Sequence, residues 1–439
     1  MKTSTINRSY TASLALYERA KKSIPLASQT FSKSITQYPM GVSPLFIKRG
    51  MGSHVWDVDD NEYIDFVNAL LAVMLGYNDA DVNAAVLAQI NNGVSFSLAH
   101  PLECQLAEKI IEMVPSAEMV RFAKNGSDVT AAAVRLARAY TGREHIITCG
   151  YHGWQDWYIG ITTRNLGVPH STQALTHSFA YNDLDALAEL FAEYPQQIAA
   201  VIMEPMTFEY PKESFLEHVK QMTHQAGAIL VFDEMITGFR WSKGGAQEYF
   251  NVIPDLTTMG KGMANGYPLS AIAGRKEIMQ LMENIFFSST FGGETVSIAA
   301  AIATLEKIEK NSVIEQLNIK GQYLLKEIQG LIQKHQLKDI LDIVGHPVWT
   351  LLCFKDFKQY SQWQIKTFWM QEILRRGILS TGTHNLSYAH TDEDINYLLA
   401  VYDEVFKLMG ESIRDGSLVS KLNCEALKPL FSVRPLVKL

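Results

Sequence analysis

Residues 228–234 read Ala-Ile-Leu-Val-Phe-Asp-Glu, a short apolar run that ends in two acidic residues. Apolar residues in unbroken succession are typical of a strand buried on both faces, as strands of a parallel sheet are. Asp233 then lies at the carboxyl end of its strand, which is the edge of such a sheet where ligands bind. An aspartate in this place could bind a metal, a ribose hydroxyl or a pyridinium nitrogen, or it could cap a helix.

The pattern around this strand extends over the central part of the chain, from about residue 67 to 315. Short apolar strands alternate there with helical patterns. The expected strands are 119–123, 145–149, 199–203, 228–232 and 270–273, and the expected helices include 128–141, 184–193 and 212–226. This alternation predicts an α/β fold with a mainly parallel sheet covered by helices on both faces.

The two ends of the chain are expected to form a smaller α/β domain. An N-terminal segment, 1–66, is predicted to hold a helix over 9–24 and a small β-meander. A C-terminal segment, 316–439, continues a long helix over 313–335. It adds strands at 340–344 and 349–354 and helices at 363–376 and 391–408. The large domain is expected to span 67–315.

The composition excludes several classes of protein. The 439 residues carry a formal net charge of −7, which argues against a dedicated nucleic-acid or anionic-membrane surface. No apolar run is long enough to span a membrane, and residues 1–8 do not resemble a signal peptide, so we expect a cytoplasmic protein. None of the four cysteines forms a CxxC pair, which predicts reduced thiols and no metal site.

Two segments that follow expected strands carry groups suited to a flat, phosphorylated ligand. Asn125-Gly126-Ser127-Asp128 opens the helix after strand 119–123, where free backbone amides could bind a phosphate, although a plain N-cap explains it as well. Gly150-Tyr151-His152-Gly153-Trp154 follows strand 145–149, and an aromatic ring there could stack on a ligand or simply pack in a loop.

Lys261 lies between Gly260 and Gly262 in a setting of small and apolar residues. A solvated charge is a poor explanation for a lysine in such surroundings, although an ordinary loop lysine stays possible. Burial lowers the pKa of a lysine, and the neutral amine is the form that attacks an aldehyde. The combination of a phosphate cradle, a stacking ring, an acid and an amine is what pyridoxal 5′-phosphate (PLP) requires.

These motifs, in this order, resemble those of class III aminotransferases, which are fold-type I PLP enzymes. The resemblance runs from about residue 31 to 406 and rests on Asp-Glu-Met-Ile-Thr-Gly-Phe-Arg at 233–240, followed by Lys261. The pattern looks most similar to the branch around glutamate-1-semialdehyde aminomutase. It implies a large domain with a mainly parallel, seven-stranded type of sheet and a small domain built from both chain ends.

The resemblance also implies roles for individual residues. Lys261 would carry PLP as a Schiff base and move the proton, and Asp233 would keep the pyridinium nitrogen protonated. Thr290 would reach the phosphate of the neighbouring subunit, so a homodimer with a shared active site is expected. The other cofactor-binding positions it implies are Gly126, Ser127, Tyr151, Glu204 and Met235.

The sequence departs from the aminomutase branch where the substrate would bind. Phe46 stands at the position of the arginine that holds the substrate carboxylate, and an apolar ring cannot replace a guanidinium. The gating glutamate is missing near His384, and Glu209 replaces an asparagine near the cofactor. The candidates for a different substrate pocket are Tyr38, Phe46, Trp154, Trp157, Glu209 and His384.

The predicted activity is transfer of an amino group from an amino donor to a carbonyl substrate by way of pyridoxamine phosphate. Glutamate is the expected amino donor, because the resemblance to this family implies it. Two alternatives stay open at this point. One is intramolecular amino transfer of the aminomutase type, and the other is a binding protein that keeps the fold without turnover.

Overall fold

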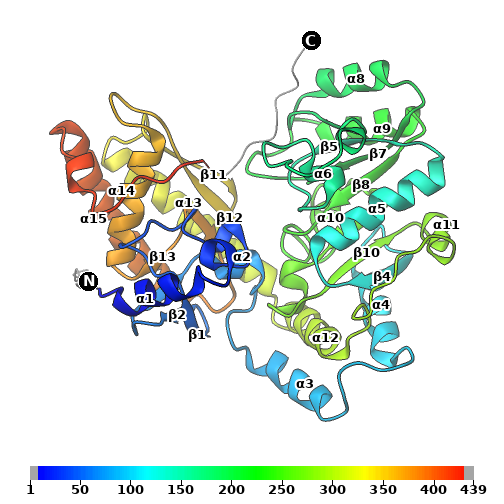
Figure 1. Ribbon diagram of the computed structural model, residues 1–439, viewed down its shortest axis with the longest axis horizontal. Helices are drawn as coiled ribbons and strands as arrows, with labels where there is room; N and C mark the ends of the chain where they lie inside the picture. Colours follow the sequence, from blue (N-terminus) through cyan, green and yellow to red (C-terminus); the bar gives the residue numbers. More distant parts are fainter. Residues whose placement is uncertain (1–7, 430–439) are drawn as a thin grey trace. The chain divides into compact units, whose positions relative to one another are not determined.

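The computed structural model describes residues 8–429, and these divide into two compact units (Figure 1). Unit 1 comprises the described residues up to 70, residues 74–79 and residues 315–429. Unit 2 comprises 71–73 and 80–314. None of the helices in the described part of the chain is long and apolar enough to cross a membrane.

Unit 2 is built on a seven-stranded sheet with the strand order β4-β10-β9-β8-β7-β5-β6. Only β10 is antiparallel to its neighbours, so the prediction of a mainly parallel sheet is confirmed. The strands are β4 (Met119–Ala123), β5 (His145–Cys149), β6 (Thr176–Ser178), β7 (Ile198–Met203), β8 (Ile229–Asp233), β9 (Leu256–Met259) and β10 (Ser270–Gly274).

Two of these strands, β6 and β9, have no counterpart among the strands expected from the sequence. β9 reads Leu-Thr-Thr-Met, and β6 has three residues at the edge of the sheet, so neither shows a long apolar run. β9 is nevertheless fully buried between β8 and β10. The neighbouring strands, rather than its own composition, place it in the sheet.

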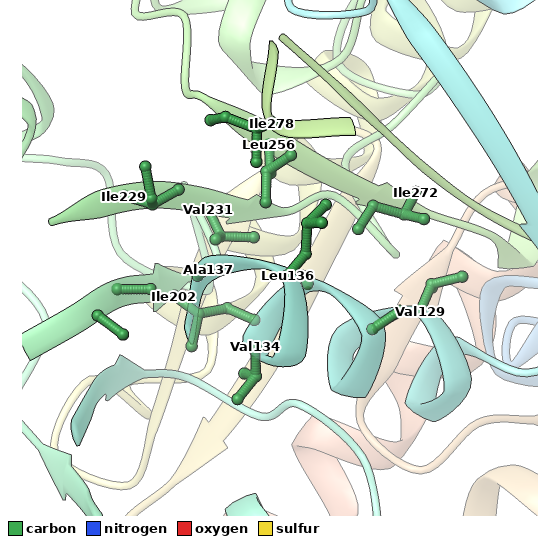
Figure 2. Close-up of a cluster of buried hydrophobic side chains, with 14 of the residues drawn as sticks. Val129, Val134, Leu136, Ala137, Ile202, Ile229, Val231, Leu256, Ile272 and Ile278 are labelled. Carbon is green, nitrogen blue, oxygen red and sulfur yellow. The ribbon is translucent and has the colours of Figure 1, made fainter. Parts of the chain in front are cut away.

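Helices cover both faces of this sheet. α5 (Gly126–Thr141) packs one buried face, and Figure 2 shows Leu136 of α5 in one cluster with Val231 of β8 and Ile272 of β10. A second buried cluster joins the sheet to α8 (Leu184–Glu193) and α9 (Phe215–Gln225). The other helices of unit 2 are α3 (Ala80–Ile90), α4 (Pro101–Met113), α6 (Asp156–Ile159), α7 (His170–Gln173), α10 (Ala246–Tyr249), η3 (Lys261–Ala264), α11 (Lys276–Met279), η4 (Gln280–Glu283) and α12 (Thr295–Lys310).

Unit 1 joins segments from both ends of the chain through a shared sheet. β13, near the C-terminal end, pairs in parallel with β3, near the N-terminal end. This sheet has the order β1-β2-β3-β13, and a second sheet has the order β11-β12-β14. The strands are β1 (Ile47–Met51), β2 (His54–Asp57), β3 (Glu62–Asp65), β11 (Leu341–His346), β12 (Trp349–Phe354), β13 (Ile378–Leu379) and β14 (Thr383–Asn385).

The longer helices of unit 1 lie where the sequence placed them, but two of them differ in length. α1 was expected over 9–24 and spans Thr11–Ala20, because residues 21–23 form a turn. α15 was expected to end near residue 408 but continues to Arg414, because Met409 and Ile413 extend its buried stripe. The helices are α1 (Thr11–Ala20), η1 (Pro25–Ala27), η2 (Phe31–Lys33), α2 (Asn68–Leu71, whose last residue belongs to unit 2), α13 (Val313–Lys334, which begins in unit 2), α14 (Gln362–Arg375), α15 (Asp392–Arg414) and η5 (Val419–Lys421).

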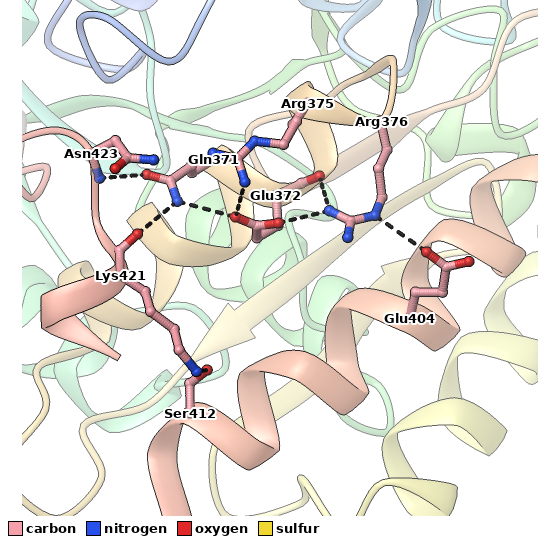
Figure 3. A network of polar contacts seen from close by, with 8 residues as sticks. All are labelled: Gln371, Glu372, Arg375, Arg376, Glu404, Ser412, Lys421 and Asn423. Carbon is pink, nitrogen blue, oxygen red and sulfur yellow. Dashed lines mark hydrogen bonds and ion pairs between the residues drawn. The ribbon is translucent and has the colours of Figure 1, made fainter. Parts of the chain in front are cut away.

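A polar network fastens the last described segment of unit 1 to α14 (Figure 3). Gln371 receives a hydrogen bond from the backbone N–H of Asn423 at 2.8 Å and donates one to the carbonyl of Lys421 at 3.1 Å. Glu372, beside it, forms a buried ion pair with Arg376 at 2.7 Å. Charged groups buried here are therefore paired, as their desolvation requires.

A second polar cluster of unit 1 contains a titratable histidine. His54 on β2 contacts Asp394 of α15 at 3.1 Å and Glu62 of β3 at 2.9 Å. The hydrogen bond to Asp394, together with the two negative charges, raises the pKa of His54. Burial opposes ionisation of Asp394, but the hydrogen bonds from His54, Thr391 and Ser53 outweigh it and lower the pKa of Asp394.

We expect this cluster to make the stability of unit 1 depend on pH. A raised histidine pKa adds stability below about pH 6.5 that is lost as the pH rises through the folded-state value. A lowered aspartate pKa adds stability above about pH 4 that is lost on acidification. His54→Gln should therefore lower the melting temperature of unit 1 more at about pH 5.5 than at about pH 9. Scanning calorimetry at both pH values measures the two melting temperatures. His170→Gln, at an exposed position, is the control. An equal decrease in melting temperature at both pH values would contradict the prediction.

Candidate active site

The candidate site lies in unit 2, where Lys261 begins η3 directly after β9 and Gly260. Lys261 has a φ of 44°, in the left-handed region that only a well-supported lysine adopts. Within the described residues no carboxylate lies close enough to form an ion pair with its amine. Burial lowers the pKa of Lys261, and the positive charge of Arg240 adds to this, while Glu204 and Asp233 act in the opposite direction. The amine is thereby biased toward its neutral, nucleophilic form.

Asp233 is the last residue of β8 and is almost fully buried. One carboxylate oxygen lies 2.7 Å from Nδ1 of His152. The other accepts hydrogen bonds from Oγ1 of Thr258 and from the backbone N–H of Met235, both at 3.2 Å. Three donors on three different segments hold the carboxylate in one orientation.

His152 is a site residue that was not among those expected from the sequence. Because its Nδ1 faces a carboxylate, that nitrogen carries a hydrogen. Its Nε2 is buried without a hydrogen-bond partner among the described residues, and its ring stacks on Trp157 with centroids 6.1 Å apart. The available signal was its position next to Tyr151, as the one histidine of that five-residue segment.

Glu204 follows β7 and faces the segment that carries Tyr151. Its Oε2 accepts a hydrogen bond from the backbone N–H of Tyr151 at 2.9 Å. Gly150 has a φ of 113°, and a Cβ there would lie 2.5 Å from that same Oε2, so the close approach requires glycine. Burial and the nearby charge of Asp233 raise the pKa of Glu204.

The N-terminus of α5 forms a cradle of small residues beside these groups. Ser127 Oγ accepts a hydrogen bond from the backbone N–H of Trp154 at 3.2 Å. A Cβ at Gly153 would lie 2.1 Å from that oxygen, and a Cβ at Gly126 would lie 2.9 Å from Sδ of Met235. The first amides of this 16-residue helix are donors for an anion.

The arrangement fits PLP. The amine of Lys261 is available for an aldehyde, and the buried carboxylate of Asp233 suits a protonated ring nitrogen. Tyr151 is 53% exposed, and an aromatic ring at this place suits stacking on a flat ring. The cradle at Gly126 and Ser127 suits a phosphate.

Comparison with known proteins agrees with this geometry. The family model of class-III aminotransferases matches residues 37–389. The chain belongs to this family. It is accordingly a PLP-dependent aminotransferase, an enzyme rather than a binding protein that only keeps the fold.

Relatives of this aminotransferase include enzymes with several substrates. It is 34% identical over 402 residues to a 3-aminobutyryl-CoA aminotransferase of Cloacimonas acidaminovorans, covering 89% of this chain and 96% of the relative. The FumI protein of Sphingopyxis sp. MTA144, solved as its PLP internal aldimine form, is 29% identical with a TM-score of 0.85, covering 95% and 99% of the two chains. An omega-transaminase of Sphaerobacter thermophilus is 26% identical with a TM-score of 0.83, covering 91% and 98%.

A glutamate-1-semialdehyde aminomutase of Pseudomonas aeruginosa has the same fold, with a TM-score of 0.79, but is only 19% identical over 91% of this chain and 95% of its own. The aminomutase branch is thus one of several structural neighbours of this aminotransferase. The comparisons therefore support the predicted class-III family, but they do not single out the aminomutase branch within it.

The remaining expected site residues are two groups of three and Trp157. Thr290, Trp154 and Glu209 are exposed side chains of unit 2 loops. Tyr38, Phe46 and His384 belong to unit 1. Trp157 is buried against His152.

His384 is fully buried, and both of its ring nitrogens are engaged, with Thr350 Oγ1 at 2.9 Å and Tyr402 Oη at 2.8 Å. Burial lowers the pKa of His384 to about 3, so the ring is neutral. The structure thus leaves neither nitrogen of His384 free for a substrate.

The assignment of Lys261 predicts a specific labelling result. Borohydride reduction of the enzyme with bound PLP should attach the cofactor to the peptide that contains Lys261, and Lys261→Ala should abolish this label without unfolding the protein. Peptide mass spectrometry locates the label.

Lys366→Ala is the matched control for this experiment. Burial also lowers the pKa of Lys366, to about 8, and this lysine lies on α14 of unit 1. The control variant should keep the label on Lys261. A label that persists in Lys261→Ala would refute the assignment.

Proposed function

We propose that this aminotransferase acts on an amine that carries no free carboxylate, with a β-amino acyl thioester as the first candidate. The observation that carries the proposal is that, among the described residues, Arg240 is the guanidinium that acts on Lys261, and its donors are engaged elsewhere. Arg240 acts electrostatically on Lys261, but it is buried. It donates hydrogen bonds to the carbonyls of Leu71 at 2.6 Å and of Ile236 at 3.2 Å.

Two further observations support this substrate class. Phe46 stands where the aminomutase pattern has its carboxylate-binding arginine, and an apolar side chain favours an uncharged group over a carboxylate. The relative named for 3-aminobutyryl-CoA is 34% identical to this chain. In that compound the amine lies two carbons from the carboxyl group, which is masked as a thioester.

We propose that each residue around the cofactor has a separate role in the reaction. When bound, PLP supplies an aldehyde that takes up the substrate amine and a ring that accepts electrons from the adjacent carbon. Lys261 Nζ, kept neutral by burial, would take the proton from that carbon and deliver it to the former aldehyde carbon of the cofactor, so that the amino group stays with the cofactor. Asp233 holds a proton on the ring nitrogen, and His152 and Thr258 hold Asp233 in place.

The substrate proposal is tested by comparing one amine in two forms. We expect kcat/KM for the thioester of 3-aminobutyrate to exceed that for the free acid by about tenfold or more, since a carboxylate without a partner is costly to desolvate. Phe46→Arg should shift this ratio toward the free acid. Ile47→Arg adds the same charge at the first residue of β1, whose side chain is exposed, and should leave the ratio unchanged.

Two outcomes would contradict the substrate proposal. One is a wild-type preference for the free acid when both forms are tested with the same carbonyl acceptor. The other is conversion of a single amino aldehyde in the absence of any keto acid, which would establish intramolecular transfer instead.

We propose that the active unit is a homodimer in which Thr290 reaches the partner's cofactor phosphate. Thr290 is exposed on the loop before α12, where it contacts the solvent instead of the cradle at Gly126. Large apolar side chains are exposed on this loop and on the segment before α4. They include Phe286 at 83% and Leu98 at 85%, as well as Phe96 and Phe291. Exposed apolar surface of this kind favours burial against a second copy.

The dimer proposal predicts a mass in solution near twice 49.2 kDa. Leu98→Glu with Phe286→Glu should give monomers, and these should bind PLP more weakly because the partner's hydroxyl is lost. Thr290→Ala should weaken PLP binding without dissociating the dimer. Light scattering and PLP titration measure both effects, and full PLP affinity in a monomer would disprove the shared site.

A further inference from the structure

The peptide group that joins Gly150 to Tyr151 is held by side chains at both of its polar atoms. Its carbonyl oxygen, on Gly150, accepts a hydrogen bond from the hydroxyl of Tyr158 at 2.8 Å. Its N–H, on Tyr151, donates to Oε2 of Glu204 at 2.9 Å. Most backbone groups outside helices and strands bond to other backbone groups or to water. Two side-chain partners on one peptide group therefore restrict the orientation of that group.

This constraint acts on the direction of the Tyr151 side chain. A peptide group is planar, so fixing its oxygen and its hydrogen fixes the orientation of the plane. The Cα of Tyr151 belongs to that plane, so its position is fixed and the direction of the Cα–Cβ bond can change only by rotation about the N–Cα bond. The ring of Tyr151 also meets the ring of Tyr158 edge-on, with centroids 5.7 Å apart and planes at 89°. Aromatic pairs favour this geometry.

Tyr158 is itself rigidly placed. It lies on the one-turn helix α6, is 1% exposed, and its ring meets that of His152 edge-on at 5.4 Å. The neighbouring Trp157 accepts a hydrogen bond at its carbonyl from Thr176 Oγ1 of β6 at 2.6 Å. α6 is therefore fastened to the edge of the central sheet, and Tyr158 transmits that rigidity to the Tyr151 segment.

Glu204 holds the other side of the same peptide group from the end of β7. The absence of a Cβ at Gly150 lets the chain approach this carboxylate closely. Its bond to the N–H of Tyr151 is a charge-assisted one when the carboxylate is ionised, which makes it the stronger of the two.

We propose that Tyr158 and Glu204 are positioning residues that together set the angle of the Tyr151 ring against the cofactor. The proposal rests on the assignment of Tyr151 as the residue that stacks on PLP. Neither residue needs to touch the cofactor for this role. Both act through the backbone and ring of Tyr151.

The test is a double-mutant cycle on cofactor binding. PLP is titrated into protein stripped of cofactor, and both the dissociation constant and the visible circular dichroism of bound PLP are recorded. Tyr158→Phe keeps the ring and removes one hydrogen bond, so we expect PLP to bind about 3- to 10-fold more weakly. The dichroism should decrease as well, because the stacking ring is less fixed. In a Tyr151→Leu background, Tyr158→Phe should have no further effect on either quantity.

Two further variants serve as comparisons. Tyr397→Phe removes a hydroxyl that donates to a backbone carbonyl at 2.9 Å in unit 1, and it should leave PLP binding unchanged. Glu204→Gln keeps an oxygen that can accept from the N–H of Tyr151 and should retain most of the dichroism, whereas Glu204→Ala should lose it.

The possible results separate this proposal from the assignment on which it rests. If Tyr151→Leu leaves PLP affinity and dichroism unchanged, the stacking assignment fails. If Tyr151→Leu weakens binding but Tyr158→Phe matches the wild type, the stacking role stands and the positioning role is overturned. Equal effects of Tyr158→Phe with and without the Tyr151 ring would also overturn it, because the hydroxyl would then act by another route.

Discussion

The burial of an unpaired amine is the constraint on which the rest of the site depends. Lys261 sits at the end of a fully buried strand with no carboxylate at ion-pairing distance among the described residues, and burial lowers its pKa. A buried ammonium without a partner is costly, so this position favours the neutral form that carbonyl chemistry requires. The acids nearby, Glu204 and Asp233, are each occupied by other donors. The protein thus keeps two carboxylates near the amine of Lys261, but neither forms a salt bridge with that amine.

Asp233, the last residue of β8, and Glu234, the residue after it, show how one strand end serves both stability and chemistry. The two acids face different surroundings. Asp233 faces His152 and the cofactor side. Glu234 accepts hydrogen bonds from Thr237 and from the backbone N–H groups of Ala246 and Gln247. Glu234 organises the loop after the strand, while Asp233 stays available to a ligand.

The aromatic residues after β5 also divide into one that faces the site and others that support it. Tyr151 presents a half-exposed ring to the site, whereas His152, Trp157 and Tyr158 form a buried layer behind it. The buried layer contacts both Asp233 and the backbone of Tyr151. The two groups expected to contact the cofactor ring, the acid and the stacking ring, are therefore supported by one packed cluster.

Most of the architecture was accessible from local patterns in the sequence. The apolar run 228–232 indicated a buried strand, and Asp233 followed at its carboxyl end because strand direction is set by the order of residues along the chain. The segment 125–128 indicated a possible phosphate cradle, and the small, apolar setting of Lys261 indicated an amine that is not an ordinary solvated charge. Strand β9 and edge strand β6 were not accessible, since their residues carry little apolar signal of their own. Neighbouring strands supply their hydrogen bonds and their burial.

Only the tertiary structure decided how these residues cooperate. His152 meets Asp233 across 81 positions of sequence, and Glu204 meets the backbone of Tyr151 across 53. No local periodicity encodes such contacts, because they depend on which strands lie side by side in the sheet. The same holds for His384, whose polar ring suggested a ligand role until folding placed both of its nitrogens in hydrogen bonds within a core. The sequence by itself determined the kinds of chemical group and their order along the chain. Packing determined which of those groups are paired, which are neutral and which remain free to act, because pairing and burial set their energies.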